Sequence, residues 1–250
     1  MKVLVFAGSP RPEKSVSLEA ARRMLGEFAE MSGEEPETEI ITEKSAEIDS
    51  CRGCMSCFHS GICTLEKHDG MAEIKKKMLE ADIIVFATPI YAANVSVFMN
   101  MLFQRLSGWL HMMPLMGRKA VLVTSSCGNG IGIVNNYMRN VVWGLGIRIA
   151  SVLNVIAREK ADLDSGYNAD KTEKSARLLS VCVSEDTVPE LFNSGLEKYF
   201  SSLKEQMARS GEENGYEYEY WEKTGLFDCG SFEEAEALIC ENKMIGILEV

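Results

Sequence analysis

Short apolar runs alternate with stretches of helical periodicity through the first 157 residues of this 250-residue chain. Continuous apolar runs of this length are typical of strands that are buried on both faces of a sheet. Five of them predict strands, at residues 3–7, 39–42, 83–87, 120–123 and 147–156. Between the runs, apolar residues recur every three or four positions, as Leu18, Ala21, Leu25 and Phe28 do, which predicts amphipathic helices. The alternation predicts an α/β protein whose parallel sheet is covered by helices on both faces.

The five strands predict a flavodoxin-like doubly wound parallel sheet over residues 1–157, in which ligands bind beyond the carboxyl ends of the strands. The pattern changes after this point. Asp162–Lys174 is polar and rich in turn-forming residues, which predicts an excursion or linker, whereas the apolar spacing over 191–207 predicts another helix. We therefore expect residues 158–250 to form a mostly helical C-terminal extension that acts as a lid or in dimerisation.

The composition is that of an ordinary globular protein, with 46% hydrophobic and 25% charged residues. A net charge of −11 argues against nucleic acid or an anionic membrane as a partner, and no apolar run approaches the ~20 residues of a membrane helix. Met1–Gly8 lacks the apolar length and the cleavage site of a signal peptide, so we expect a cytoplasmic protein with reduced cysteines. Any anionic ligand would also need a local pocket of positive potential.

Half of the eight cysteines lie in one short segment, at Cys51, Cys54, Cys57 and Cys63. In a reducing compartment, thiolates at this density favour a metal centre over disulfides, and iron–sulfur chemistry before zinc. Zinc sites usually separate two Cys-x2-Cys pairs by a longer loop, which is lacking here. We name residues 51–63 the cysteine segment. Its spacing leaves three interpretations open: an iron–sulfur cluster, zinc, or thiols that bind nothing.

The loop after the first predicted strand, Gly8–Ser17, has the chemistry of an anion site. It offers hydroxyls, backbone N–H groups and one guanidinium at the start of a helix. A nucleoside triphosphate P-loop would need glycine where Glu13 stands, and a Gly-x-Gly-x-x-Gly dinucleotide fingerprint is absent. The loop therefore predicts a cradle for one terminal phosphate.

Two further loops follow the third and fourth predicted strands. Thr88–Asn94 contains Tyr91, which can stack on a ring, and Asn94, which can hydrogen-bond to a ring nitrogen. The glycines of Thr124–Gly132 allow the backbone to approach a flat ligand closely. Because parallel strands end at one edge of a sheet, we expect the three loops to meet there. Together they suit flavin mononucleotide (FMN) better than a dinucleotide.

With Gln104-Arg105 downstream, the Gly8-Ser9-Pro10-Arg11 and Thr88-Pro89-Ile90-Tyr91 motifs resemble the NADPH-dependent FMN reductase family of flavodoxin-like proteins. The cysteine segment resembles that of the family's iron–sulfur flavoprotein branch. This resemblance covers residues 1–157, and it implies bound FMN, a 4Fe-4S cluster on the four cysteines and a homodimer or homotetramer. It places the phosphate against Ser9, Arg11, Ser15, Val16 and Ser17. It places the isoalloxazine ring against Pro89, Ile90, Tyr91, Asn94, Ser125, Ser126, Cys127 and Gly128.

These observations predict an FMN oxidoreductase that takes electrons from NAD(P)H and passes them to a small-molecule acceptor or, through the cluster, to a redox protein. We expect no catalytic side chain, only backbone N–H groups near Ser126–Gly128 that stabilise negative charge on the flavin. The alternative is a non-enzymatic electron carrier for a protein partner, and a third hypothesis is a zinc-stabilised flavin-binding module. Tyr220 and Trp221 are candidate contacts from the C-terminal extension to the flavin edge.

Overall fold

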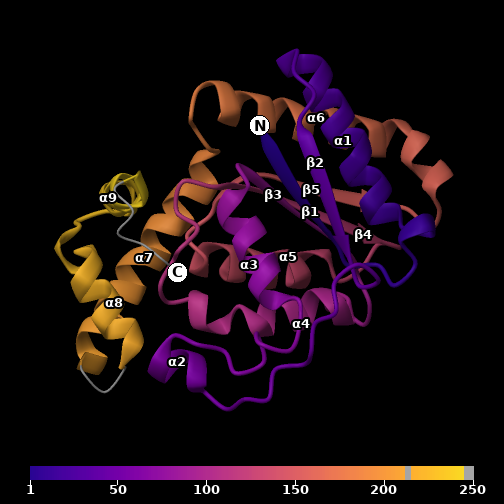
Figure 1. Ribbon diagram of the computed structural model, residues 1–250. Coiled ribbons are helices and arrows are strands. Elements are labelled where there is room, and N and C mark those ends of the chain that lie inside the picture. The colour runs from indigo at the N-terminus through magenta and orange to yellow at the C-terminus, as the bar shows by residue number, and fades with distance from the viewer. Residues whose placement is uncertain (212–214, 245–250) are drawn as a thin grey trace.

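A computed structural model describes residues 1–211 and 215–244, and within them the chain builds one parallel sheet (Figure 1). Its strands pair in the order β2-β1-β3-β4-β5, which confirms the flavodoxin-like doubly wound layout. Their bounds are β1 Lys2–Ala7, β2 Glu37–Thr42, β3 Ile83–Pro89, β4 Lys119–Ser126 and β5 Arg148–Ile156. The three central strands are almost entirely buried, as their continuous apolar sequences predict.

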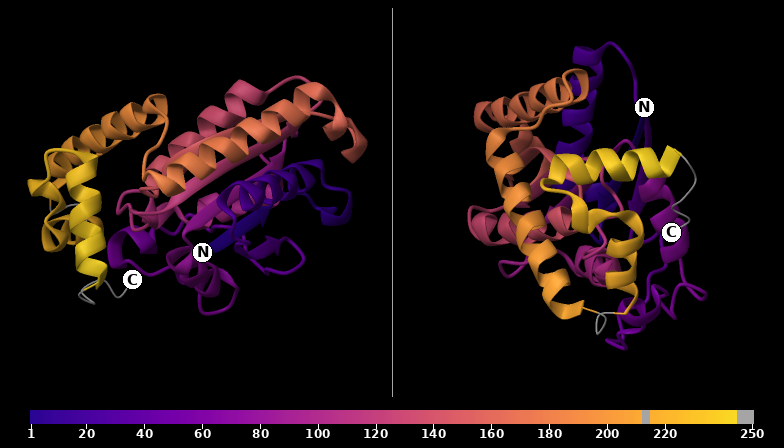
Figure 2. Two further views of the ribbon diagram at one scale, coloured as in Figure 1. Left: turned by 90° about the horizontal axis from the view of Figure 1, so that it is seen from above. Right: turned by 90° about the vertical axis from the view of Figure 1, so that its left-hand side faces the viewer.

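Each face of the sheet carries its own layer of helices, because alternate strand side chains point to opposite faces (Figures 1 and 2). The helices concerned are α1 Val16–Ser32, α3 Met71–Glu80, α4 Val97–Arg105, α5 Ile131–Gly144 and α6 Gly166–Ser184. Leu4 and Phe6 of β1 share a core with α3, α4 and α5. Val3 and Val5 share a second core with α1 and α6 on the opposite face.

Helix α6 stands where the sequence predicted a linker at 162–174, so that prediction was wrong. After a 3-10 helix at Lys160–Asp164, the chain enters α6, which packs against α1 and β5. The side chain of Asn168 donates to the backbone O of Ile156 (2.9 Å) and accepts its N–H (3.1 Å), while Ser175 hydrogen-bonds to a hydroxyl of β5. Because the buried face of α6 begins with such polar side chains, hydrophobic periodicity does not reveal the helix.

Beyond α6, the described residues form three further α-helices, α7 Glu190–Ser210, α8 Tyr216–Thr224 and α9 Phe232–Met244, which lie together beside the sheet (Figure 2). Trp221 is fully buried and stacks on Phe200 with 5.6 Å between ring centroids, and Tyr220 is only 7% exposed. Both rings are therefore core residues, which corrects the expectation that they contact the flavin edge. The role of residues 158–250 as a lid or in dimerisation stays a prediction. No helix in the described ranges is long and apolar enough to cross a membrane.

Candidate functional site

The loops that follow β1, β3 and β4 meet at the carboxyl edge of the sheet. The N–H of Gly8 donates to the backbone O of Ala87 (2.7 Å), and the N–H of Ile90 donates to that of Ser125 (2.9 Å). Position 8 needs glycine, because an added Cβ would lie 2.6 Å from the hydroxyl of Ser96 at the start of α4. Backbone hydrogen bonds thus join each loop to the next, as the topology predicted.

The first loop ends at the N-terminus of α1. Ser15 is the N-cap residue, and its hydroxyl accepts the backbone N–H of Leu18 at 3.1 Å. Ser17 is fully buried and its hydroxyl lies 3.2 Å from that of Ser15. On the other side of the loop, the hydroxyl of Ser9 accepts the N–H of Arg11 at 3.3 Å. Since the first N–H groups of a helix lack partners within it, this helix start favours an anion.

The second loop turns sharply between Tyr91 and Asn94, whose backbones exchange two hydrogen bonds of 2.9 Å. The residues at its tip, Ala92 and Ala93, have φ values of +50° and +57°, a left-handed conformation that is costly for residues with a side chain. The side chain of Asn94 accepts the N–H of Val95 at 2.8 Å. The loop therefore uses Asn94 for its own structure and leaves Tyr91, which is 47% exposed, free to contact a ligand.

The third loop is organised by Ser126. Its hydroxyl donates to the backbone O of Asn129 (2.6 Å) and accepts the N–H groups of Gly128 (3.0 Å) and Asn129 (3.1 Å). Gly128 adopts a φ of +121°, which side-chain-bearing residues rarely reach. The N–H of Gly128 is therefore already used within the loop, and stabilisation of charge on the flavin by other backbone N–H groups near Ser126–Gly128 stays a prediction. Cys127 is exposed between these two residues.

A cavity of about 230 Å³ lies between the three loops, and we name it the strand-end cavity. It is lined by ten of the predicted cofactor-binding residues, Ser9, Arg11, Ser15, Val16, Pro89, Ile90, Tyr91, Ser125, Ser126 and Cys127. Ser17, Asn94 and Gly128 are outside the lining, and each makes the loop hydrogen bond described above. Three larger hollows, of about 500, 640 and 240 Å³, lie away from these loops.

Three lining residues were not selected from the sequence: Lys14, Ala157 and Arg158. The N–H of Ala157 donates to the backbone O of Ser126 at 3.0 Å, which brings the end of β5 to the same edge. With Arg11, Lys14 and Arg158, the cavity has three cationic side chains in a chain of net charge −11. They provide the local positive potential that an anionic ligand needs. The sequence feature that could have revealed Arg158 is its position just after the fifth predicted strand, because the carboxyl ends of parallel strands lie at one edge of the sheet.

The cysteine segment lies at the other end of α4, about 13 Å along this nine-residue helix, and includes the short helix α2 (Ser56–Ser60). Its four cysteines are free thiols: Cys51 and Cys54 are exposed, whereas Cys57 and Cys63 are half-buried. Burial raises the pKa of Cys57, and the neighbouring Cys63 and Cys51 raise it further. The Cys57 sulfur is therefore close enough to those of Cys63 and Cys51 to be influenced by both.

The donor set of the cysteine segment fits an iron–sulfur cluster. Among residues 1–211 and 215–244, no three Cys, His, Asp or Glu side chains are grouped to hold a single metal ion. A 4Fe-4S cluster takes one cysteine for each iron, and the segment contains four cysteines. Gly108 gives Cys57 room, because an added Cβ would lie 2.8 Å from the Cys57 Cβ. Hydrogen bonds from the backbone of Ser56 and from Thr64 lower the pKa of Cys54, which favours the thiolate that binds metal.

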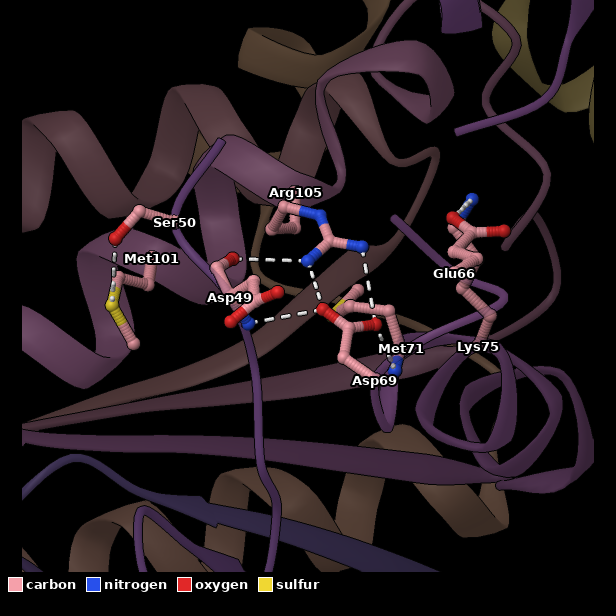
Figure 3. A network of polar contacts seen from close by, with 8 residues as sticks. All are labelled: Asp49, Ser50, Glu66, Asp69, Met71, Lys75, Met101 and Arg105. Atoms are coloured by element: carbon pink, nitrogen blue, oxygen red, sulfur yellow. Dashed lines mark hydrogen bonds and ion pairs between the residues drawn. The ribbon is translucent and has the colours of Figure 1, made fainter. Parts of the chain in front are cut away.

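A buried ion pair and its hydrogen bonds join the two ends of the cysteine segment (Figure 3). Arg105, at the end of α4, pairs with Asp69, and their side chains are 0% and 4% exposed. Arg105 also donates to the backbone O of Asp49 (2.9 Å), and the Asp69 carboxylate accepts the N–H groups of Asp49 (3.0 Å) and of the first residue of α3 (3.1 Å). Asp49 precedes Cys51 and Asp69 follows Cys63, so we name Arg105, Asp69 and Asp49 the neck clamp.

Both members of the ion pair are held in their charged forms. Burial alone would raise the pKa of Asp69, but hydrogen bonds from Arg105 and from two backbone N–H groups outweigh it and lower that pKa. Burial would lower the pKa of Arg105, but its hydrogen bonds to Asp69 and its interaction with the sulfur of Cys63 raise that pKa. The guanidinium is therefore a fixed positive charge beside one of the four cysteines.

The C-terminal helices cover the cysteine segment rather than the strand-end cavity. Gly61, which ends α2, lies against the ring of Tyr216 in α8, so that an added Cβ would lie 2.5 Å from it. Nδ1 of His111 lies 3.0 Å from the buried carboxylate of Glu217, and Nε1 of Trp221 donates to the backbone O of His111 at 2.6 Å. The first contact attaches α8 to the cysteine segment, and the other two attach it to His111, whose ring lies 5.9 Å from that of Phe58 in α2.

Comparison with known proteins places this geometry in a family. Residues 1–162, more than half of the chain, match the family described as NADPH-dependent FMN reductase. The chain belongs to this family. The prediction drawn from the loop motifs is thereby confirmed, and the matched region contains both the strand-end cavity and the neck clamp.

Relatives of this FMN reductase family member include proteins named iron–sulfur flavoprotein. One from Methanocaldococcus jannaschii is 41% identical over 105 residues, which are 42% of this chain and 51% of the relative, so the match spans about half of that protein. One from Archaeoglobus fulgidus is 32% identical over 170 residues, which are 66% of this chain and 74% of the relative. A solved azoreductase from Bacillus anthracis shares the fold, with a TM-score of 0.54 and 16% identity over 72% of this chain and 99% of that one.

Proposed function

We propose that the chain is an FMN-dependent oxidoreductase that takes electrons from NAD(P)H. It passes them to a small-molecule acceptor or, through a 4Fe-4S cluster on the cysteine segment, to a one-electron redox protein. The observation that carries the proposal is the strand-end cavity, where three loops, three cationic side chains and the start of α1 converge. The family match and the relatives named iron–sulfur flavoprotein support it.

The residues of the strand-end cavity divide into two groups by their chemistry. Ser15 and the free N–H groups of α1 would bind the terminal phosphate, and Arg11, Lys14 and Arg158 would balance its charge. Tyr91 would contact the ring from the exposed side of the cavity. FMN, when bound, supplies two-electron uptake from a nicotinamide and one-electron release, which the cluster matches. The protein supplies binding, orientation and charge.

We also propose that the protein is a homodimer or homotetramer. Val97 and Ile133, at the starts of α4 and α5, are 72% and 65% exposed, and both follow loops that line the strand-end cavity. Burial of such side chains against a second copy is favourable, because it removes apolar surface from water. Light scattering of the wild type and of a V97E/I133E variant tests this: a monomeric wild type, or an unchanged assembly in the variant, would contradict it.

The proposed function is tested by anaerobic purification followed by analysis of flavin, iron, sulfide and zinc. We expect FMN bands with broad iron–sulfur absorbance beneath them, and NAD(P)H oxidation with a small acceptor such as a quinone. Protein that binds no FMN on reconstitution would refute the proposal. Bound flavin and iron without turnover of any small acceptor would show the electron carrier instead. Stoichiometric zinc without iron would show the zinc-stabilised flavin module.

A further inference from the structure

The neck clamp leaves one hydrogen-bond donor unused. Arg105 uses its terminal nitrogens on Asp69 and on the backbone of Asp49. Its Nε is buried and has no hydrogen-bond partner within the described part of the chain. Buried donors without an acceptor are uncommon in proteins, so this one is available to a group bound beside it. The sulfur of Cys63 is close enough to this guanidinium to raise its pKa.

We propose that Arg105 is a positioning residue for the cluster. It holds the two ends of the cysteine segment together and places a buried positive charge beside the ligand Cys63, which raises the cluster's reduction potential, while its Nε–H is available to the cluster. This inference rests on the proposed function, because it requires a cluster on the four cysteines. It adds to that function a residue, Arg105, that tunes the reduction potential of the cluster.

The expected direction follows from charge. A cluster held by four thiolates is anionic and becomes more so when it gains an electron, so a nearby cation and an N–H to sulfur favour the reduced form. Cys51 and Cys54 face water, which screens charges near them, whereas Cys63 lies beside the buried Arg105. Asp69 offsets part of the charge of Arg105. Neutralising Asp69 should therefore raise the potential, and neutralising the pair should lower it.

Lysine cannot replace Arg105 in this role. The planar guanidinium presents five N–H donors, and here they serve the Asp69 carboxylate and the Asp49 carbonyl while Nε remains free. A lysine ammonium has three donors at one point and cannot reach all of these groups from α4. Arg105→Lys thus removes the planar set of N–H donors. It keeps the positive charge that pairs with Asp69, which lowers the risk that the variant fails to fold.

Four variants separate tuning from simple structural support: R105K, D69N, the double variant D69N/R105Q, and R148K as the matched control. Arg148 pairs with Glu236 at 2.7 Å at the start of β5, away from the cysteine segment. The potential is measured by redox titration followed by electron paramagnetic resonance, after FMN, iron and sulfide have been quantified. We expect R105K to weaken reduction about tenfold, a shift of about −59 mV for one electron. D69N should shift the potential upward, D69N/R105Q downward, and R148K not at all.

Opposite shifts in D69N and D69N/R105Q support the inference, because a merely structural role gives no reversal of sign. Unchanged potentials, or shifts of one sign in both variants, would overturn the tuning role. Hydrogen exchange at the Asp49 amide tests the clamp without reference to any metal: it should be faster in R105K than in R148K, and equal rates would overturn it. If the wild-type protein, purified anaerobically, contained no iron, the iron–sulfur cluster in the proposed function would be refuted instead.

Discussion

The hydroxyl of Ser15 offers a quantitative test of the phosphate cradle. It is 4% exposed, lines the strand-end cavity and accepts the N–H of Leu18 as the N-cap of α1. Both Ser15→Ala and Ser15→Gly remove the hydroxyl that caps α1 and that we expect to bind the phosphate, but glycine at an N-cap costs far less stability than alanine. Position 15 has a φ of −70° and a ψ of 119°, which either residue adopts without strain.

The magnitudes differ between stability and binding. Loss of the cap lowers the free energy of unfolding by about 1 kcal/mol in S15A and by a few tenths in S15G. A hydrogen bond to a charged group is worth about 1.5–3 kcal/mol, so both variants should bind FMN about 10- to 100-fold more weakly. Riboflavin lacks the phosphate, and its affinity should change by less than about twofold.

The assay is quenching of flavin fluorescence during titration of the flavin-free protein, with FMN and riboflavin measured side by side. Urea unfolding of the same samples gives the contribution of the cap. The reasoning would be refuted if S15A and S15G bound FMN as tightly as the wild type. It would also be refuted if riboflavin affinity fell as far as FMN affinity, because the lost contact would then not be to phosphate.

Four further predictions concern the rest of the molecule. C54S and C57S should lose iron and keep FMN, because other residues line the strand-end cavity; loss of flavin with iron in metal and flavin analysis would disprove the separation of the two sites. G108A should lower the iron content, since its Cβ would lie 2.8 Å from that of Cys57, and an unchanged iron-to-protein ratio would count against this contact. W221A should reduce the free energy of unfolding by about 3–5 kcal/mol, because a fully buried ring is removed; a urea-unfolding difference below about 1 kcal/mol would contradict that. The folded-state pKa of Asp69 lies below its ordinary value of 3.8, so the stability it contributes is present above that pH and is lost as the pH falls through the folded pKa. Unfolding measured from pH 7 to acid should show this loss in the wild type and not in D69N.

The sheet and the meeting of its loops could be predicted because both depend on strong signals. A continuous apolar run identifies a buried strand, and parallel strands place the loops that follow them at one edge. Helix α6 could not be predicted in this way, since Asn168 and Ser175 bury polar groups against β5. Its contacts are specific hydrogen bonds, which leave no periodic apolar pattern.

The loops that line the strand-end cavity could be predicted, but not the use that each of their polar groups finds. Sequence shows which polar groups a loop contains, and it does not show which of them the loop itself uses. Three of these polar groups are used by the loop itself, because each is hydrogen-bonded within it: those of Ser17, Asn94 and Gly128. The ion pair of the neck clamp joins Arg105 to Asp69 across 36 positions, so no local spacing reveals it.

The attachment of α8 to α2 has a consequence for how such proteins diverge. The family match ends at residue 162, yet α8 packs on the short helix that contains Cys57. The wall around the cysteines is thus built partly by sequence that the common core does not dictate. Under the proposed function, a change in these C-terminal helices would alter the surface that a redox protein meets there while the loops of the strand-end cavity stay the same. The covering of the cysteine segment and the loops of the strand-end cavity are therefore free to evolve separately.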